Sequence, residues 1–289
     1  MLRQRLPMGI ALILALIGVL WLDSKLTPWH PIWHALVLLA GLLAASELGK
    51  LLEQIIARPF QPLMVLATGG CLLANALVPV KNLAGVSALG PVAAAFVVFL
   101  ALLLLTGVKL FDDARPVLPR MAATLFGVAY IGLMGSFLTL LRVMFESTSG
   151  PFALYLVVAA TKGTDTGAYT FGKLFGRHLM TPRLSPKKTW EGAAGGVLFA
   201  IGLTFLVQLI EQASTGTRLL TSTAETLLFA ISISIAGQLG DLAESLIKRE
   251  ARTKDASVSL PGFGGVLDLL DSLLLAAPVG WFFLVLPHF

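Results

Sequence analysis

The sequence predicts an all-α, polytopic membrane protein with about nine transmembrane helices and a cytoplasmic N-terminus. The composition is the first observation. The 289 residues are 56% hydrophobic and 13% charged, with a mean hydropathy of +0.86, whereas soluble domains carry about 25% charged residues. The second is a series of long apolar runs along the chain, and the third is the clustering of Lys and Arg in alternate loops. No stretch is polar enough to form a separate soluble domain.

The apolar runs have the length that a membrane helix needs, about 20 residues. The first follows MLRQR and resembles a signal peptide. The following LDSKLTPWHP offers no small-x-small cleavage site, so we expect a retained helix. Pro and Gly mark several joints between the runs. The runs lie near residues 8–22, 31–48, 62–80, 84–107, 120–141, 151–171, 192–210, 223–243 and 264–286.

The basic residues predict the orientation. With the N-terminus inside, only four loop cations fall outside, namely Lys25, Lys81, Arg142 and Arg218. Because Lys and Arg accumulate in cytoplasmic loops, the N-terminus is expected inside and the C-terminus outside. The segments 173–188 and 248–255 are then cytoplasmic. The helices of 1–150 are expected to be a lipid-side scaffold, and 151–289 a catalytic region with cytoplasmic loops.

The first five helices carry little chemistry. Polar residues such as Glu47 and Asn75 are interpreted as helix-end or interhelical contacts. His30 and His34 lie four residues apart beside tryptophans, and this favours an interfacial belt over a metal site. Cys71 is the only cysteine, which excludes an intrachain disulfide and a cysteine-based metal site. The net charge of +5 is explained by cytoplasmic loops, so nucleic acid is not an expected partner.

The segment 161–177, TKGTDTGAYTFGKLFGR, contains the first charged constellation. Lys162 and Asp165 are three residues apart and can pair on one turn of a helix. A buried structural ion pair and part of a polar cavity open to the cytoplasm are both compatible with this spacing.

The second constellation is LSPKKTWEG, residues 184–192. Ser185-Pro186 predicts a turn, and Lys187 and Lys188 come just before the seventh helix. Thr189 can cap that helix, whose N-terminus favours anions. Two lysines at such a terminus suit a phosphate. A positive-inside anchor that touches lipid phosphates is the alternative.

The third constellation spans residues 240–272. Asp241, Glu244, Ser245 and Lys248 follow a helical stripe, which Gln238 extends backwards. A basic loop and a PGFGG turn come next, and then Asp268 and Asp271 share a helix face. Structural ion pairs with nearby Lys and Arg are one interpretation. Aspartates on two membrane helices also suit a hard cation such as Mg²⁺, and with basic residues they suit phosphoryl or nucleotidyl transfer.

The last stretch resembles the signature of the phosphatidate cytidylyltransferase (CDP-diacylglycerol synthase) family. That signature reads Ser-x-x-Lys-Arg, four residues, Lys-Asp, a short spacer, Gly-His-Gly-Gly, two residues and Asp-Arg-x-Asp. DTGAYTFGKLFGR and SPKKTWEG are similar to preceding blocks of the same family, so the resemblance covers about 160–275. Phe263 replaces the signature histidine and Leu269 its arginine. The matching residues are Ser245, Lys248, Arg249, Lys254, Asp255, Gly262, Gly264, Gly265, Asp268 and Asp271.

The resemblance implies transfer of CMP from CTP to phosphatidic acid, giving CDP-diacylglycerol and pyrophosphate in phospholipid biosynthesis. Asp241, Asp268 and Asp271 would bind one or two divalent cations, with Mg²⁺ or another hard cation expected, and Lys248 and Arg249 would complete the catalytic set. The PGFGG loop could bind phosphate through backbone N–H groups. The remaining substrate-binding residues would be Asp165, Ser185, Lys187, Lys188, Glu191, Ser245, Lys254, Gly262, Gly264 and Gly265.

The expected setting is the cytoplasmic membrane, with the active site facing the cytoplasm and membrane lipids around it. The resemblance also suggests a homodimer. Three alternatives stay open: a CTP-dependent enzyme acting on another lipid, such as a polyprenol kinase or an isoprenoid-lipid cytidylyltransferase; a non-catalytic member, in view of Phe263 and Leu269; and, least favoured, an ion-coupled transporter. A transporter would spread its acids through the bilayer depth and show repeated halves, whereas these acids gather towards one face.

Overall fold

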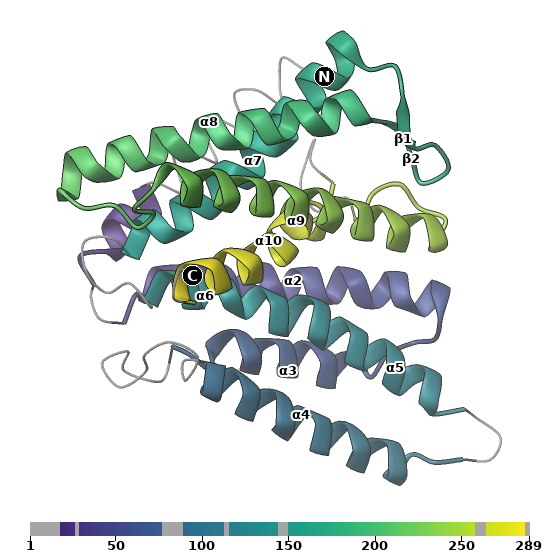
Figure 1. Cartoon of the computed structure of the whole chain (residues 1–289). Coiled ribbons are helices and arrows are strands. Elements are labelled where there is room, and N and C mark those ends of the chain that lie inside the picture. The colour runs from purple at the N-terminus through teal and green to yellow at the C-terminus, as the bar shows by residue number, and fades with distance from the viewer. Residues whose placement is uncertain are drawn as a thin grey trace. The chain divides into compact units, whose positions relative to one another are not determined.

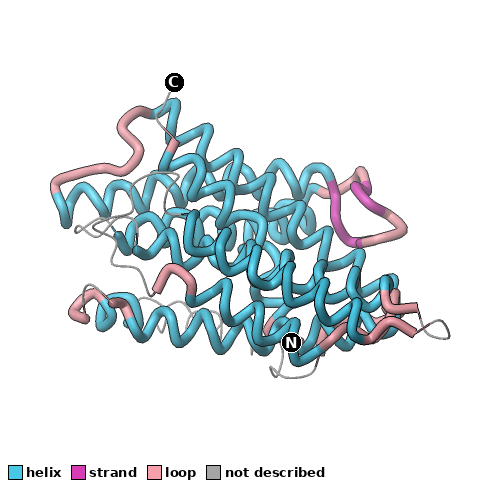
Figure 2. Tube along the Cα trace, turned by 90° about the horizontal axis from the view of Figure 1, so that it is seen from below, coloured by secondary structure: helices cyan, strands magenta, loops and turns pink. Residues whose placement is uncertain are grey.

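The computed structural model describes residues 18–26, 29–76, 89–112, 116–143, 150–257 and 264–286. Most of this part of the chain is helical (Figures 1 and 2). Six of them are long and apolar enough to cross a membrane. The structure is therefore helical with several candidate membrane spans, as the composition predicts. Of the first apolar run, residues 18–22 are described, and the chain there is helical as far as residue 23.

The chain folds as two compact units. The first comprises Met1–Val143 and Glu250–Leu270, and the second Met144–Arg249 and Asp271–Phe289. The Gly-rich stretch near residue 264 thus belongs with the N-terminal helices. The predicted division of roles near residue 150 stays a prediction.

In the first unit, α3 packs against both α2 and α4 (Figure 1). A π-helical turn, η3, lies between α5 and α6, so the predicted run 120–141 is one helical segment with a wide turn in its middle. Cys71 packs in the core with Phe60, Met64 and Phe99. The elements are α2 (Pro31–Ile55), α3 (Gln61–Leu73), α4 (Gly90–Lys109), α5 (Leu118–Gly127), η3 (Val128–Leu133) and α6 (Met134–Val143).

A buried ion cluster joins α6 to the start of α2. Asp23 is fully buried, and its Oδ2 lies 3.2 Å from both Arg142 Nη2 and His30 Nδ1. Its Oδ1 accepts the N–H groups of Ile32 and Trp33 at 3.0 and 3.1 Å. Burial raises the pKa of Asp23, but these hydrogen bonds and the Arg142 charge outweigh burial and hold the pKa below its ordinary value.

The interfacial belt predicted for His30 and His34 is wrong. Their exposed fractions are only 1% and 4%. His30 faces the Asp23 carboxylate, and His34 Nδ1 donates to the backbone oxygen of His30 at 2.7 Å. A buried carboxylate needs polar partners, which explains why His30 lies inside the fold, and His34 packs beside it.

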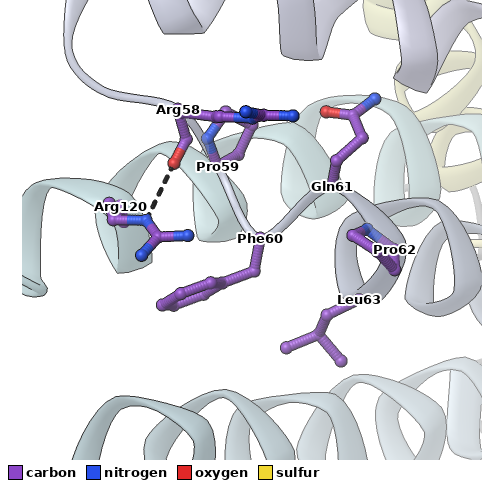
Figure 3. Close-up of a pocket in the computed structure, with 7 residues that line it drawn as sticks. All are labelled: Arg58, Pro59, Phe60, Gln61, Pro62, Leu63 and Arg120. Carbon is purple, nitrogen blue, oxygen red and sulfur yellow. Dashed lines mark hydrogen bonds between the residues drawn. The ribbon is translucent and has the colours of Figure 1, made fainter. Parts of the chain in front are cut away.

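The joint between α2 and α3 forms an open pocket of about 380 Å³ (Figure 3). Arg120 Nε donates to the backbone oxygen of Arg58 at 3.2 Å, and the Arg120 guanidinium lies 4.4 Å from the centre of the Phe60 ring. The Phe60 N–H donates to Thr124 Oγ1 at 2.9 Å. The joint is therefore tied to α5. The pocket is lined by Arg58, Pro59, Phe60, Gln61, Pro62, Leu63 and Arg120.

In the second unit, α7 and α8 pack along each other, joined by a short antiparallel hairpin (Figures 1 and 2). The predicted turn at Ser185-Pro186 lies slightly earlier, at residues 182–184, because Ser185 pairs with Thr181 in the hairpin. The predicted cap of α8 is confirmed: Thr189 Oγ1 accepts the Gly192 N–H at 3.1 Å. The elements are α7 (Gly150–Phe175), β1 (Leu179–Thr181), β2 (Ser185–Thr189), α8 (Trp190–Thr215), α9 (Thr223–Glu250) and α10 (Leu267–Val285).

Candidate functional site

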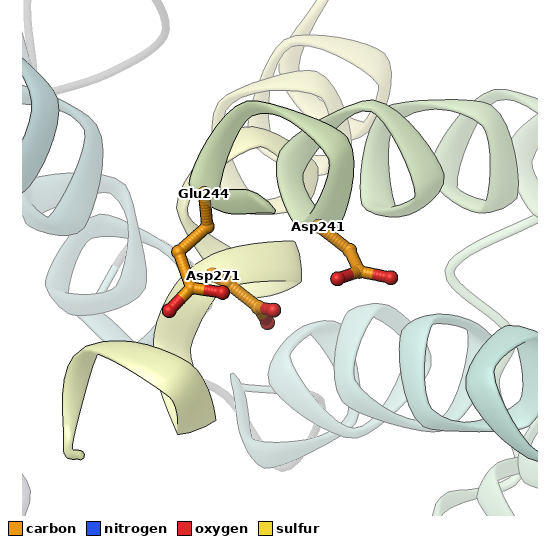
Figure 4. A group of neighbouring side chains, drawn as sticks. All are labelled: Asp241, Glu244 and Asp271. Carbon is orange, nitrogen blue, oxygen red and sulfur yellow. The ribbon is translucent and has the colours of Figure 1, made fainter. Parts of the chain in front are cut away.

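Three carboxylates meet in the second unit. Asp241 and Glu244 project from one face of α9, and Asp271 comes from α10 (Figure 4). One oxygen of each lies within 4.8 Å of the others. Glu244 and Asp271 are buried, with exposed fractions of 1% and 8%, whereas Asp241 is half-buried. The structure therefore brings together two of the three predicted metal ligands and adds Glu244, which the sequence placed on the same stripe without a metal role.

Close backbone packing allows this approach. Gly240 lies where α9 meets α10, and a Cβ there would be 2.5 Å from the Asp271 backbone oxygen and 3.0 Å from Ser272 Cα. A larger residue would therefore separate the two helices next to the carboxylates.

Lysines lie directly beside two of these acids. Lys188 Nζ is 2.5 Å from Asp241 Oδ2, and Lys248 Nζ is 2.5 Å from Glu244 Oε2. Lys188 comes from β2, and Lys248 lies one turn after Glu244 on α9. Two of the four predicted site lysines, Lys188 and Lys248, therefore lie beside the acidic group.

A third lysine connects to Asp271. Lys162 Nζ lies 3.1 Å from Asp165 Oδ2, which confirms the predicted pairing, and it also donates to Ser272 Oγ at 3.2 Å. Ser272 Oγ in turn donates to Asp271 Oδ1 at 3.0 Å. Neither Lys162 nor Ser272 was among the predicted site residues. The signal for Lys162 was its charge within an apolar run, where a cation is unfavourable without a partner.

The donor set fits a hard divalent cation. Three carboxylates this close repel one another, and oxygen ligands of this type select ions such as Mg²⁺. Alternating acids and lysines could also bind a polyphosphate together with its cation, because the lysines supply positive charge for phosphate oxygens.

The hairpin separates the two predicted lysines. Successive strand residues point to opposite faces, and on β2 Lys187 is exposed while Lys188 is half-buried against Asp241. Only Lys188 reaches the acidic group among the hairpin residues described. Ser185 is half-buried on the same strand.

Two further predicted residues support the hairpin. The Glu191 carboxylate accepts the N–H groups of Arg177 and His178 at 3.1 and 3.2 Å, and it lies 2.5 Å from His178 Nδ1. Glu191 therefore links the end of α7 to the start of α8. Arg249 Nε donates to the backbone oxygen of Leu184 at 3.3 Å, so α9 supports the hairpin turn.

Gly264 and Gly265, the described end of the Gly-rich PGFGG turn, lie in the first unit. Asp268 Oδ2 accepts the Ala256 N–H at 3.0 Å and the Gly265 N–H at 2.6 Å, so one predicted phosphate-binding N–H is already used. Gly264 has a φ of +95°, a conformation that L-residues rarely adopt. The metal role of Asp268 stays a prediction. Lys254 is exposed, and Ser245 and Leu269 are half-buried. Gly262 and Phe263 lie outside the described residues.

The proteins that this chain resembles include several phosphatidate cytidylyltransferases. The model of the cytidylyltransferase family matches residues 3–286. The chain is 37% identical to a phosphatidate cytidylyltransferase of Mycobacterium leprae over 165 residues, which are 57% of this chain and 50% of that protein. It is 43% identical to the Bacillus subtilis phosphatidate cytidylyltransferase over 123 residues, or 43% and 44% of the two chains. These matches span about half of each relative's length. A phosphatidate cytidylyltransferase of Mycobacterium bovis is 29% identical over 99% of this chain and 89% of its own.

Proposed function

The chain belongs to the cytidylyltransferase family, and we propose that it transfers CMP from CTP to phosphatidic acid, giving CDP-diacylglycerol and pyrophosphate. The observation that carries this proposal is the convergence of Asp241, Glu244 and Asp271 beside lysines in a membrane unit. The relatives that carry the name phosphatidate cytidylyltransferase support the choice of substrates.

The lipid phosphate is the nucleophile. One of its oxygens attacks the α-phosphorus of CTP, a new P–O bond forms, the bond between the α-phosphorus and the bridging oxygen breaks, and pyrophosphate leaves. A phosphate monoester is already anionic at neutral pH, so the step needs no separate general base. The protein mainly holds two anions together and offsets their repulsion.

The acidic group is the proposed cation site. Asp241, Glu244 and Asp271 would hold one or two divalent cations, with Asp268 as the further ligand that the sequence predicts. A bound Mg²⁺ would supply charge neutralisation of the phosphates and orient them. The side chains of Lys188, Lys162 and Lys248 would contact phosphate oxygens, or hold the carboxylates until substrate binds.

The remaining predicted binding residues fall into two groups. Glu191, Ser185 and Arg249 would shape the hairpin that carries Lys188. Lys187 and Lys254 would contribute positive charge at the cytoplasmic surface. The glycines near residue 264 would allow the backbone to approach the substrate closely.

The proposed setting is the cytoplasmic membrane. Nine spans with the N-terminus inside would place the hairpin and the 248–255 loop in the cytoplasm, where CTP is available. The asymmetry of loop charge supports this orientation, and the six apolar helices support a multi-pass protein.

The test is turnover by the purified protein in mixed micelles of phosphatidic acid. With CTP and Mg²⁺ we expect radiolabelled CDP-diacylglycerol and stoichiometric pyrophosphate. Asp271→Asn should lower the rate by at least about a hundredfold, whereas Glu53→Gln, an exposed acid on α2, should not change it. Product from a polyprenol or isoprenoid acceptor but not from phosphatidic acid would refute the proposed substrate.

A further inference from the structure

Glu47 makes contacts that its place in the sequence does not suggest. It lies on α2, with 5% of its surface exposed. Its Oε1 accepts the Ser257 hydroxyl at 2.6 Å, and its Oε2 accepts the Leu267 N–H at 2.9 Å. The expected interhelical polar contact is therefore confirmed, because Leu267 is the first residue of α10. Glu47 binds both described ends of the Gly-rich loop, including the first residue of α10.

Gly265 lies directly against this carboxylate. A Cβ on Gly265 would lie 2.5 Å from Glu47 Oε2 and 2.9 Å from its Cδ. Glycine at this position therefore makes room for the acid. In the first turn of α10, Asp268 Oδ2 accepts the N–H groups of Ala256 and Gly265. Two carboxylates thus bind residues next to the loop, one from α10 and one from α2.

The first turn of α10 is the part that Glu47 holds most directly. Leu267 begins this helix, and Asp268, a predicted metal ligand, follows it directly in the same unit. A shift of the Leu267 backbone therefore moves Asp268 as well. A buried acid in a membrane helix is unfavourable, and such residues usually have a function.

We propose that Glu47 is a positioning residue, which holds Ser257 and the first turn of α10 in the arrangement that cytidylyl transfer requires. This inference rests on the proposed function. Glu47 acts through the Leu267 N–H and the Ser257 hydroxyl, and it does not touch the substrates.

The first experiment measures steady-state kinetics for Glu47→Ala and Glu47→Gln. We expect kcat to fall about tenfold to a hundredfold in Glu47→Ala, with a changed KM for CTP or Mg²⁺ requirement but an unaltered KM for phosphatidic acid. Glu47→Gln keeps one acceptor oxygen, so its loss should be smaller. Glu53→Gln is the matched control, because Glu53 lies on the same helix with 51% of its side chain exposed.

The second experiment uses Gly265→Ala. In the native chain the added methyl group collides with Glu47, so activity should fall. In the Glu47→Ala background there is room for it, and the added loss should largely disappear. Equal losses from Gly265→Ala in both backgrounds would overturn the proposed contact.

Amide hydrogen exchange tests the contact between Glu47 and Leu267 without measuring turnover. Glu47→Ala should speed exchange of the Leu267 amide at least about tenfold, while amides of α8 keep their native rates. Unchanged exchange at Leu267, or native kinetics in Glu47→Ala, would refute the inference. If the native protein makes no CDP-diacylglycerol, the proposed function fails, and the exchange result still decides whether Glu47 anchors α10.

Discussion

Gly240→Ala tests whether the acidic group depends on close contact between α9 and α10. The new Cβ would lie 2.5 Å from the Asp271 backbone oxygen, whereas ordinary contacts begin at 3.4 Å. The α10 backbone must therefore retreat by about 0.9 Å, because close-packed interiors leave no spare room. This displacement falls on the residue that carries one of the three carboxylates.

The expected effect on rate is much larger than the effect on stability. A displacement of about 1 Å at a reacting centre can cost on the order of a hundredfold in rate. Overpacking costs about 1–3 kcal/mol, and replacing helical Gly by Ala offsets up to about 1 kcal/mol of that. We therefore expect kcat to fall about a hundredfold, while the free energy of unfolding falls by only about 1 kcal/mol.

The assay is CDP-diacylglycerol formation at saturating CTP, with thermal unfolding in the same detergent. Gly202→Ala on α8 is the matched control, since a Cβ there meets nothing within 4 Å. Its activity should equal that of the native protein. Native turnover in Gly240→Ala, or an equal loss in Gly202→Ala, would refute the packing argument.

Three further predictions concern charge. Lys188→Met should lower kcat/KM for CTP by at least about tenfold. The neighbouring Lys187→Met should have a smaller effect, because the Lys187 side chain is exposed. Equal losses in the two variants would contradict the strand faces assigned to these lysines. Chelation of divalent cations should abolish turnover and Mg²⁺ should restore it, and Asp241→Asn should raise the Mg²⁺ concentration needed for half-maximal rate. The pKa of Asp23 is lower in the folded protein than in the unfolded chain. The ionised carboxylate should therefore stabilise the fold at pH values above the ordinary aspartate pKa, and this stabilisation should be lost as the pH falls through the folded pKa. Asp23→Asn should destabilise the protein by about 3–5 kcal/mol near neutral pH. Its melting temperature should fall less on acidification than that of the native chain. Parallel curves of melting temperature against pH for the two proteins would contradict this assignment.

Helix periodicity was sufficient for much of the candidate site. The helical stripe on α9 placed Asp241 and Glu244 on one face, and the spacing of Lys162 and Asp165 predicted their pairing. The same reasoning could not bring Glu244 together with Asp271, since that depends on how α9 and α10 approach at Gly240. Local spacing carries no information about such an approach.

Other features escaped because they depend on distant segments. Glu47 contacts Ser257 and Leu267, which are separated from it by more than 200 residues, and no periodic pattern connects them. The different environments of Lys187 and Lys188 follow only from the extended backbone of β2. His30 looked interfacial because its partner, the buried Asp23 carboxylate, could not be recognised without the packing of α6.

The π-helical turn η3 also sets the rotational phase of the helix that follows it. A π turn contains about one residue more than an α turn, and each residue corresponds to about 100° around the axis. Removing one residue from Val128–Leu133 would restore regular winding and rotate α6 by that angle. Arg142 would then leave the face that meets Asp23. The number of residues in this membrane segment is thus coupled to one buried ion pair, and a single-residue deletion would act at a distance through helical phase.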